Sequence, residues 1–201
     1  LDLRGFAGGK GIAVLVDGAR VNDPRNNGAA VEQVPLDGVE RIEITRGPAA
    51  ALAGGGAEAG VIRIVTRRGS TPGASVSASA GTWNTRRYDG TYGVDFGRFD
   101  LFLAGTYDTT DGFRQNAGGD QTRLDATGGF DLGGDRRLSL SFLSSDLAYG
   151  NPGALTLAEF NADPGKNVYN TLDSTDDVAR QVALNFQGAV GGGFSLAANG
   201  A

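Results

Sequence analysis

The side chains that most often carry chemistry in proteins are scarce in this sequence. Its 201 residues include no cysteine and no histidine. Zinc sites built on these ligands, thiolate chemistry and catalytic triads with a histidine base are therefore excluded. Pairs of Asp and Glu suited to glycoside hydrolysis remain open, but none has a specific arrangement. We expect no catalytic residue, no metal site and no cofactor, and we interpret the protein as not an enzyme.

Two segments resemble binding motifs without meeting their requirements. Gly8-Gly9-Lys10-Gly11 is rich in glycine, but it lacks the spacing of a phosphate-binding loop and no Lys-Ser or Lys-Thr pair closes it. Asp173, Asp176 and Asp177 could offer carboxylates to calcium, but the residue order of an EF-hand and its closing Glu are missing. We interpret this acidic segment as a solvated loop.

The balance of charge argues against a nucleic-acid partner. The formal net charge is −5, and the 18 Lys and Arg residues are scattered along the chain. No stretch approaches about 18 consecutive apolar residues, so no transmembrane helix is predicted. No signal peptide is visible, and the first residues already have the texture of the middle of a domain. We therefore expect the chain to be a truncated piece of a larger protein.

The elements that must position these side chains fall into two regions, which we divide at residue 70. In residues 1–70, β-rich runs at Ile12–Val16, Val39–Thr45 and Val61–Thr66 predict strands. Pro48–Leu52 predicts a helical turn, which the glycines that follow would end. This first region is therefore expected to form a compact mixed α/β unit.

Residues 71–201 instead alternate between apolar and polar side chains in about seven segments. A period of two places the two sets on opposite faces of a sheet. The apolar set includes Leu101, Leu103, Leu138, Leu140, Val182, Leu184 and Phe186. The polar set includes Asp125, Thr127, Ser139, Ser141, Asn185 and Gln187. Phe102 breaks the alternation. The pattern fits a soluble β-sandwich half-buried on its core, and it also fits a barrel with lipid outside and a polar lumen.

The connections between these segments alternate in length. Gly97-Arg98 and Gly133-Gly134-Asp135 are short, whereas the connections at roughly 108–122 and 148–179 are long. Outer-membrane barrels have short periplasmic turns and long outer loops. The alternation favours antiparallel up-and-down strands of a barrel, with the apolar set on the convex face and the polar set on the concave face. A soluble carbohydrate-binding β protein, with short loops at both ends, is the alternative.

Four segments together carry a resemblance to a known family. They are Leu3-Arg4-Gly5, Val14–Gly18 (VLVDG), Val39–Pro48 (VERIEITRGP) and Gly60–Thr66 (GVIRIVT). Their order, spacing and content resemble the plug domain of TonB-dependent outer-membrane receptors. The resemblance covers about residues 1–70 and extends more loosely over the strands to Ala201. The loops Asp111–Asn116 and Asn151–Thr156 are also similar to family loops, especially those of iron-complex receptors.

This resemblance implies a fold and a function for the whole receptor. The fold is a fragment of a transmembrane β-barrel, with about its first seven strands in residues 71–201, preceded by the C-terminal part of an α+β plug domain in residues 1–70. The function is active uptake of a scarce nutrient across the outer membrane of a Gram-negative bacterium. Its partners would be the TonB complex of the inner membrane, the lipid of the outer membrane and a small-molecule substrate, and no nucleic acid.

The substrate expected by default is a ferric siderophore or another iron complex, while haem, cobalamin and oligosaccharide stay open. A non-transporting barrel such as a porin or adhesin is a second alternative, although such barrels carry no plug.

The resemblance also suggests two sets of site residues. The loop 22–28 matches the apical plug loop that faces outward, so Arg25, Asn26 and Asn27 are candidate ligand-binding residues. The alternative for them is a solvated turn, because Asn, Asp, Pro and Gly dominate turns. Arg41, Glu43 and Arg46 are candidate plug–barrel contacts, with ordinary surface charge as the alternative.

Overall fold

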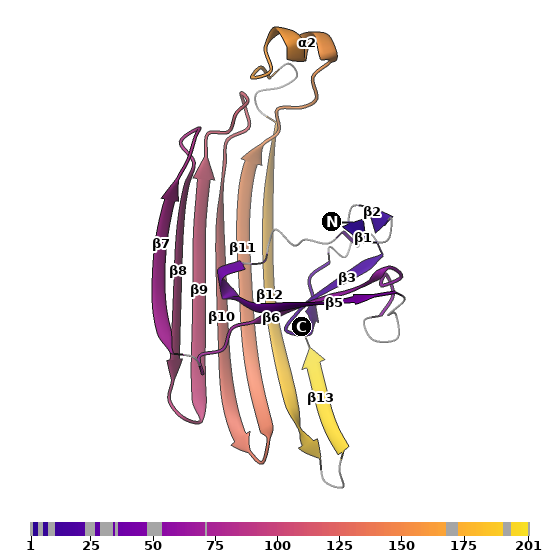
Figure 1. The fold of residues 1–201 in the computed structure, drawn as a ribbon, viewed down its shortest axis with the longest axis vertical. Coiled ribbons are helices and arrows are strands. Elements are labelled where there is room, and N and C mark those ends of the chain that lie inside the picture. Colours follow the sequence, from indigo (N-terminus) through magenta and orange to yellow (C-terminus); the bar gives the residue numbers. More distant parts are fainter. Residues whose placement is uncertain are drawn as a thin grey trace.

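The computed structural model describes most of the chain as a curved sheet with a smaller unit lying against its concave face (Figure 1). The described residues are 2–3, 6–7, 11–22, 27–28, 34, 36–47, 54–70, 72–167, 173–190 and 194–200. We call the described residues before 70 the inner unit and the curved sheet the wall. None of the described helices is long and apolar enough to cross a membrane.

The wall is a seven-stranded antiparallel meander in which every strand pairs with its neighbours in sequence. Its strands are β7 (Gly73–Ala80), β8 (Arg86–Asp95), β9 (Phe99–Thr110), β10 (Gly119–Gly133), β11 (Arg136–Gly150), β12 (Ser174–Val190) and β13 (Phe194–Gly200). No strand crosses over another, so the expected up-and-down order is confirmed and the Greek-key order of many sandwiches is absent from the described sheet.

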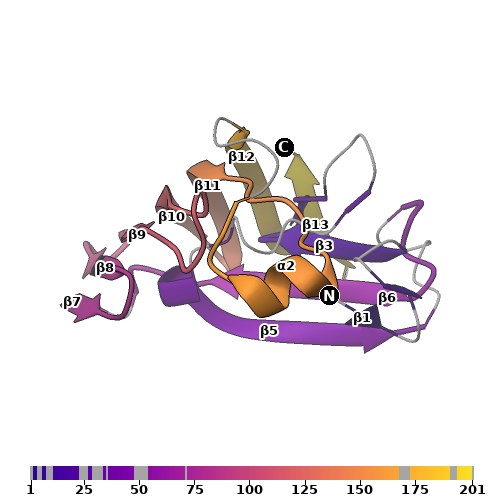
Figure 2. The same ribbon diagram turned by 90° about the horizontal axis from the view of Figure 1, so that it is seen from above.

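The two faces of the wall differ as the period of two predicts. Leu103, Leu140, Val182 and Leu184 are 40–54% exposed and lie on the convex face, whereas Asp125 and Thr127 of the opposite set are 3% and 5% exposed. Seen from above, the strands form an arc whose hollow side holds the inner unit (Figure 2). The apolar set packs against no second sheet in the described structure, which contradicts the sandwich alternative.

Phe102 is where the simple alternation fails, and the structure explains the failure. Phe102 shares the concave face with Ala104 and Thr106, and it is only 4% exposed. Leu143 lies on the same face opposite Asp125 and is also buried. Apolar side chains are therefore tolerated on the concave face where the inner unit covers them and excludes water.

The connections of the wall separate into a short end and a long end. The turns after β8 and β10 lie at one end, and connection 111–118 and the described part of connection 151–173 lie at the other (Figure 1). The strands are longer than the sequence pattern suggested, so both long connections are shorter than expected. The second of them carries the short helix α2 (Leu157–Ala162).

The inner unit is built on a four-stranded mixed sheet. Its order is β4 (Ala19–Arg20), β3 (Ile12–Val16), β6 (Gly60–Thr66) and β5 (Val39–Arg46), with β3 and β6 parallel and the other pairs antiparallel. A separate pair, β1 (Asp2–Leu3) and β2 (Phe6–Ala7), precedes it. The three predicted strands are present. The helical turn expected at Pro48–Leu52 lies outside the described residues.

The core of the inner unit lies on both faces of this sheet, because a smaller cluster of Ala13, Ala57 and Val61 lies opposite the larger one. Ile12, Val14, Ile62 and Ile64 are 0–7% exposed and form a cluster that also includes Val34. A short 3-10 helix, η2 (Leu36–Gly38), leads into β5. The close pairing of β3 with β6 explains why both strands are almost wholly apolar, since a central strand is covered on both sides.

The connection from β6 to β7 approaches the wall more closely than any side chain would allow. The backbone N–H of Gly69 donates to Asp100 Oδ1 at 3.1 Å, and a Cβ built on Gly69 would overlap the Leu101 backbone. Asp100 also binds the Arg137 guanidinium, which lies over Gly129 where a Cβ would collide with it. Two glycines thus permit the contact that fixes the connection to β9 and β11.

We predict that Gly69→Ala in the full-length protein destabilises the seating of this connection by about 1–3 kcal/mol, because the added methyl group must displace strand backbone. Equilibrium unfolding in denaturant measures the loss. Gly73→Ala is the matched control, since a Cβ at Gly73 meets nothing within 4 Å. Unfolding of the two variants at the same denaturant concentration would show that the backbone at Gly69 tolerates a side chain.

Candidate functional site

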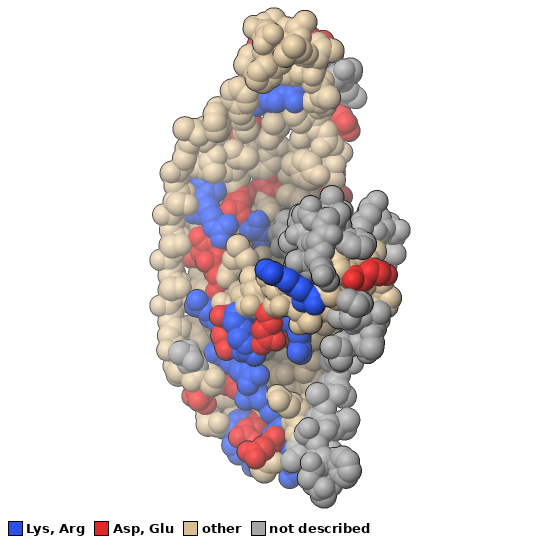
Figure 3. Space-filling model, turned by 45° about the vertical axis from the view of Figure 1, so that its right-hand side comes forward, with Lys and Arg blue, Asp and Glu red and all other residues tan. Residues whose placement is uncertain are grey.

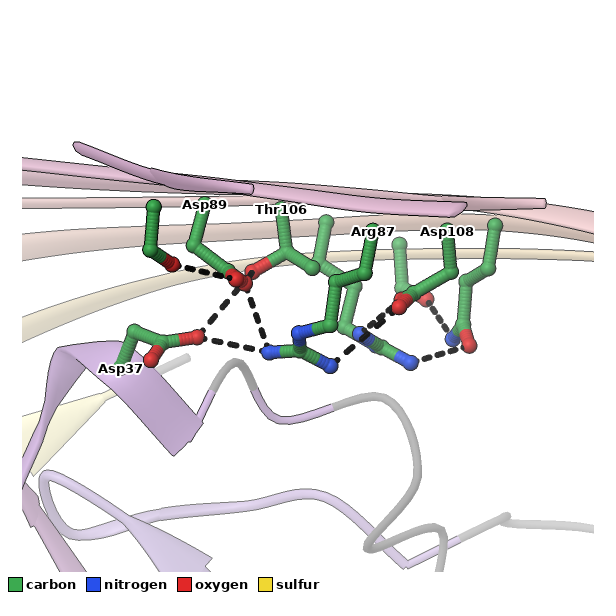
Figure 4. A network of polar contacts seen from close by, with 9 residues as sticks. Asp37, Arg87, Asp89, Thr106 and Asp108 are labelled. Atoms are coloured by element: carbon green, nitrogen blue, oxygen red, sulfur yellow. Dashed lines mark hydrogen bonds and ion pairs between the residues drawn. The ribbon is translucent and has the colours of Figure 1, made fainter. Parts of the chain in front are cut away.

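The most extensive polar contact between the inner unit and the wall centres on Arg87. Its Nη2 lies 2.7 Å from Asp37 Oδ2 of η2 and 2.7 Å from Asp89 Oδ1 of β8, and its Nη1 lies 3.3 Å from Asp108 Oδ1 of β9. Arg123 Nη1 of β10 lies 2.7 Å from Asp108 Oδ2. We call these five residues the Asp37 network (Figure 4). Only Asp37 comes from the inner unit, so the network ties η2 to three wall strands.

Hydroxyl groups complete the Asp37 network. Thr106 Oγ1 donates to Asp89 Oδ1 at 3.2 Å and lies 3.4 Å from Asp37 Oδ2, and Ser77 Oγ donates to Asp89 at 3.0 Å. Three carboxylates then face two guanidinium groups, which leaves one formal negative charge. Arg87 is about a third exposed and Asp89 is largely buried, so neither charge is fully hydrated. Their mutual contacts replace the lost water.

A second contact joins the end of β6 to β10. Thr66 Oγ1 donates to Asp17 Oδ2 at 2.6 Å and lies 3.2 Å from Thr127 Oγ1 on the wall. Thr66 N donates to Asp17 Oδ1 at 3.0 Å. The Asp17 carboxylate accepts hydrogen bonds from both the backbone N–H and the hydroxyl of Thr66. It therefore holds the Thr66 side chain where it contacts Thr127.

The wall beneath η2 is packed closely enough to bury a carboxylate. A Cβ at Gly38 would lie 3.4 Å from Ala104 Cβ and 3.5 Å from Asp125 Oδ1. Asp125 is 3% exposed, and its Oδ1 has no hydrogen-bond partner among the described residues. An unpaired buried polar atom is costly, so this contact lowers the net strength of the interface.

The predicted contact residues Arg41 and Glu43 pair first with each other. Arg41 Nε lies 2.9 Å from Glu43 Oε1 and its Nη1 lies 2.8 Å from Glu40 Oε1, while Arg63 lies 3.9 Å from Glu43. The hydrogen bond that Arg41 donates to Glu43 raises the pKa of Arg41. Arg46 is exposed at the end of β5. Their role in plug–barrel contact therefore stays a prediction, although Arg41 does border a cavity that the wall shares.

That cavity has a volume of about 310 Å³ and lies between the inner unit and the wall. The inner unit contributes Asp17, Arg41, Arg63, Thr66 and Arg68, among others, and the wall contributes Thr127, Arg137, Ser139, Ser141, Asn185, Phe186 and Gln187. Arg137 and Gln187 are paired near the short end of strands β11 and β12. The cavity therefore lies between the sheet of the inner unit and the short end of the wall.

Of the candidate ligand residues, only Asn27 lies within the described part of the chain. Its Oδ1 accepts from Arg20 Nη2 at 2.6 Å, and its Nδ2 donates to Gly56 O at 3.3 Å. Its backbone φ is 57°, a conformation that Asn tolerates better than most residues. The geometry gives Asn27 a local structural part. Arg25 and Asn26 lie outside the described residues.

The two long connections of the wall are bound to each other at the long end. Arg114 donates to the carbonyls of Gly153, Pro152 and Lys166 at 2.6, 3.2 and 3.0 Å, and Asn116 donates to Asn151 and Asp173. These bonds hold connection 111–118 and the described part of connection 151–173 (residues 151–167 and 173) together as one assembly. Thr156 is the N-cap of helix α2 and forms a capping box with Glu159. The hydrogen bonds that Thr156 donates lower the pKa of Glu159.

Aromatic and apolar side chains are exposed on this assembly and on the neighbouring turn between β7 and β8. Trp83 and Phe113 meet edge to face with ring centroids 5.6 Å apart, and both are 54% exposed. Leu157 and Phe160 of α2 are 77% and 55% exposed. Among the described residues there is no group of three or more acidic side chains arranged to hold a metal ion.

Sequence reasoning missed the Asp37 network, but a signal for it was present. Arg87 and Asp108 pair across β8 and β9, and Asp89 pairs with Thr106, all on the polar face of the alternation. Opposite charges at directly paired positions of adjacent strands indicate an organised inner surface. The missing part was Asp37, because nothing in the sequence predicts which strand η2 meets.

Three comparisons with known proteins agree on the kind of protein this resembles. Residues 1–61 match the model of the TonB-dependent Receptor Plug Domain family. The vitamin B12 transporter BtuB of Vibrio vulnificus is 35% identical over 119 residues, which are 55% of this chain and 18% of that protein. The chain therefore spans less than a fifth of this curated relative.

Solved receptor structures share the fold. The pyoverdine outer membrane receptor FpvA from Pseudomonas aeruginosa PAO1 superposes with a TM-score of 0.73 at 16% identity, over 98% of this chain and 30% of its own. The siderophore receptor PirA from the same species superposes with a TM-score of 0.64 at 23% identity, over 94% of this chain and 32% of its own. At these identities the likeness shows the fold alone.

We predict that Arg87→Met in the full-length protein lowers the free energy of unfolding by about 1–3 kcal/mol, because three carboxylates lose their shared cation. Urea denaturation measures the loss, and Asp37→Asn combined with Arg87→Met tests the coupling, which should make the double variant less destabilised than the sum of the two.

Arg180→Gln is the control for this prediction. Its ion pair with Asp146 spans 3.8 Å, and both side chains are at least half exposed, so it should change stability by less than about 0.5 kcal/mol. Additive effects of the Asp37 and Arg87 substitutions would show that η2 is not fixed through this network.

Proposed function

Because residues 1–61 match the TonB-dependent receptor plug domain, we propose that the whole protein is an outer-membrane receptor of this family for active uptake of a scarce nutrient, with a ferric siderophore or other iron complex as the leading substrate. The inner unit is then the plug, and the wall is part of the barrel. The proposal includes the outer membrane of a Gram-negative bacterium as its location and the TonB complex as its partner. It assigns the protein no enzymatic role.

The observation that carries the proposal is the seating of the plug on the polar face of a wall whose other face is apolar. A free-standing sheet in water would bury its apolar face, yet here Leu140, Val182 and Leu184 are about half exposed while the polar face is covered. Lipid on the convex side and a filled lumen on the concave side satisfy both faces. A porin or adhesin would leave the plug unexplained, and a soluble carbohydrate-binding protein would leave the convex face unexplained.

The chemistry of the plug–wall contacts suits a plug that must move. The Asp37 network, the Thr66–Thr127 contact and the bond from Gln181 Nε2 to Arg20 O are all polar. A polar contact is exchanged for hydrogen bonds to water at a net cost of about 0.5–1.5 kcal/mol, or up to about 3 kcal/mol when charged. A pull from the TonB complex, driven by the proton gradient, therefore has a modest barrier to overcome.

Substrate capture is assigned to the long end of the wall, where connections 111–118 and 151–173 form one assembly. In an up-and-down barrel the short turns face the periplasm and the long loops face outward. The apical plug loop supplies the other side of this site in the proposal. Arg25 and Asn26 are its candidate ligand contacts, and Asn27, held by Arg20 and Gly56, positions the loop.

Cobalamin is the second substrate candidate, because the 35% identical relative is a vitamin B12 transporter. The test is growth of a strain that lacks the full-length gene, supplied with single iron chelates or with cobalamin as the limiting nutrient. We expect a growth defect on one iron chelate that the full-length gene restores. A defect on cobalamin alone would replace the iron proposal, and no defect on any nutrient would contradict the uptake function.

We predict that alanine at Arg25, Asn26 and Asn27 together weakens substrate binding by the full-length receptor and leaves its insertion into the outer membrane intact. Each lost polar contact should cost about 0.5–1.5 kcal/mol. Binding of the chelate identified by the growth test, measured by fluorescence quenching on purified receptor, gives the affinity.

Arg98→Ala at the short end is the control for the triple variant. Arg98 stacks on Phe130, with its guanidinium carbon 5.5 Å from the ring centroid, on the side away from the proposed capture site. The Arg98→Ala receptor should bind the chelate with the same affinity as the unmodified receptor. Equal affinity in the triple variant would return the three residues to the solvated-turn interpretation.

A further inference from the structure

The cavity between plug and wall is lined by arginines from both of its sides. Arg41 and Arg63 project from the plug sheet, Arg68 comes from the connection to β7, and Arg137 comes from β11. Among the described lining residues the sole acidic side chain is Asp17. Figure 3 shows basic side chains gathered with acidic ones over the inner face beside and below the plug.

The acidic groups near the cavity are shared unevenly among these arginines. Asp100 binds Arg137, whereas Arg68 has no ion pair among the described residues. The Asp17 carboxylate already accepts two hydrogen bonds from Thr66. Glu43 serves both Arg41 and Arg63, and its contact with Arg63 is 3.9 Å long. Two guanidinium groups therefore share one carboxylate, and the second acid on Arg41 is Glu40, which is about half exposed.

The arginines also keep hydrogen-bond donors that no described residue fills. A guanidinium has five N–H donors in a planar fork. The described bonds of Arg41 use only Nε and Nη1. Arg137 binds Asp100 through Nη2, and its Nε is buried out of reach of a ligand, which leaves Nη1 as its donor without a described partner. A ligand with several acceptor oxygens would satisfy such donors.

We propose that this cavity binds a small molecule carrying two or more carboxylates, on the periplasmic side of the plug. Guanidinium groups match carboxylates through paired N–H bonds. The arginines come from the plug on one side and from the wall on the other, so a ligand with more than one carboxylate suits both sides. The volume of about 310 Å³ is at the lower end of small-molecule sites, which begin at about 300 Å³. Ser139, Ser141, Asn185 and Gln187 provide neutral hydrogen-bond partners.

The position of the site gives it a role in transport, and this role rests on the proposed function. A ligand held between Arg63 of the plug and Arg137 of the wall bridges the part that moves and the part that stays. The site is a second stop for an anionic substrate that has passed the plug. Displacement of the plug separates the two arginines, which weakens the site and releases the ligand toward the periplasm.

The test is titration of metal-free citrate into purified full-length receptor in detergent, followed by calorimetry at low salt. We expect saturable binding of citrate, with acetate weaker by about tenfold or more because it engages one guanidinium at a time. Arg63→Gln with Arg68→Gln should weaken citrate by about tenfold or more. Arg86→Gln, an exposed arginine on β8 outside the cavity lining, is the matched control and should leave the affinity unchanged.

Arg63→Lys with Arg68→Lys is the second variant, and it keeps the charge while removing the planar fork. Its citrate affinity should fall between those of the unmodified receptor and the Gln variant, with the thermal unfolding midpoint unchanged. The proposal is overturned if citrate binding does not saturate. It is also overturned if the Gln variant and the Arg86→Gln control bind citrate with equal affinity. Inorganic phosphate binding as tightly as citrate, with the same loss in the variants, overturns the polycarboxylate assignment.

The titration needs neither TonB nor growth, so it separates this inference from the proposed function. Citrate binding that depends on Arg63 and Arg68 in a receptor without any nutrient phenotype would leave the site standing and remove uptake. A nutrient phenotype in a receptor without citrate binding would keep uptake and remove the site.

Discussion

The two-residue period of the wall strands constrains everything else in the molecule. A strand that has lipid on one side and a filled lumen on the other must alternate apolar and polar side chains along its length. This assigns Leu140 and Val182 to one face and Thr127 and Ser139 to the other before any tertiary contact forms. The plug therefore meets mainly hydroxyls, amides and charges, with Phe102 and Ala104 among the few apolar exceptions.

Within this constraint, the strength of the interface depends on how completely its polar groups are matched. The Asp37 network joins five charged groups and leaves one negative charge over, so most of its partners are satisfied. Asp125 beneath Gly38 is the opposite case, because its buried oxygen lacks a described partner. Favourable and unfavourable contacts lie side by side under η2. Such a surface seats the plug in one position without binding it as firmly as an apolar core would.

The order of the wall strands and the separation into a short end and a long end could be predicted from the sequence, because both depend on local patterns. Alternation predicts faces, and Gly97-Arg98 or Gly133-Gly134-Asp135 predict turns. The sequence pattern ended strands such as β9 too early, because Thr109 and Thr110 carry no pattern that separates a strand from a loop. Phe102 contradicted the period of two, and only the plug that covers it accounts for its burial.

The candidate site was less predictable, for a physical reason that Asp37 illustrates. Arg87, Asp89 and Asp108 belong to neighbouring strands, so their proximity follows from pairing register. Asp37 lies fifty residues from Arg87, and their contact depends on how the whole plug is docked. The family resemblance pointed to Arg41 and Glu43, whose described ion pairs stay within the plug. The arginine cavity depends on the same docking. In their own strands, Arg63 is an ordinary exposed charge and Arg137 an ordinary inner-face charge. They line one cavity because the plug lies against the wall, where Gly69 lets the connection from β6 to β7 lie against Leu101.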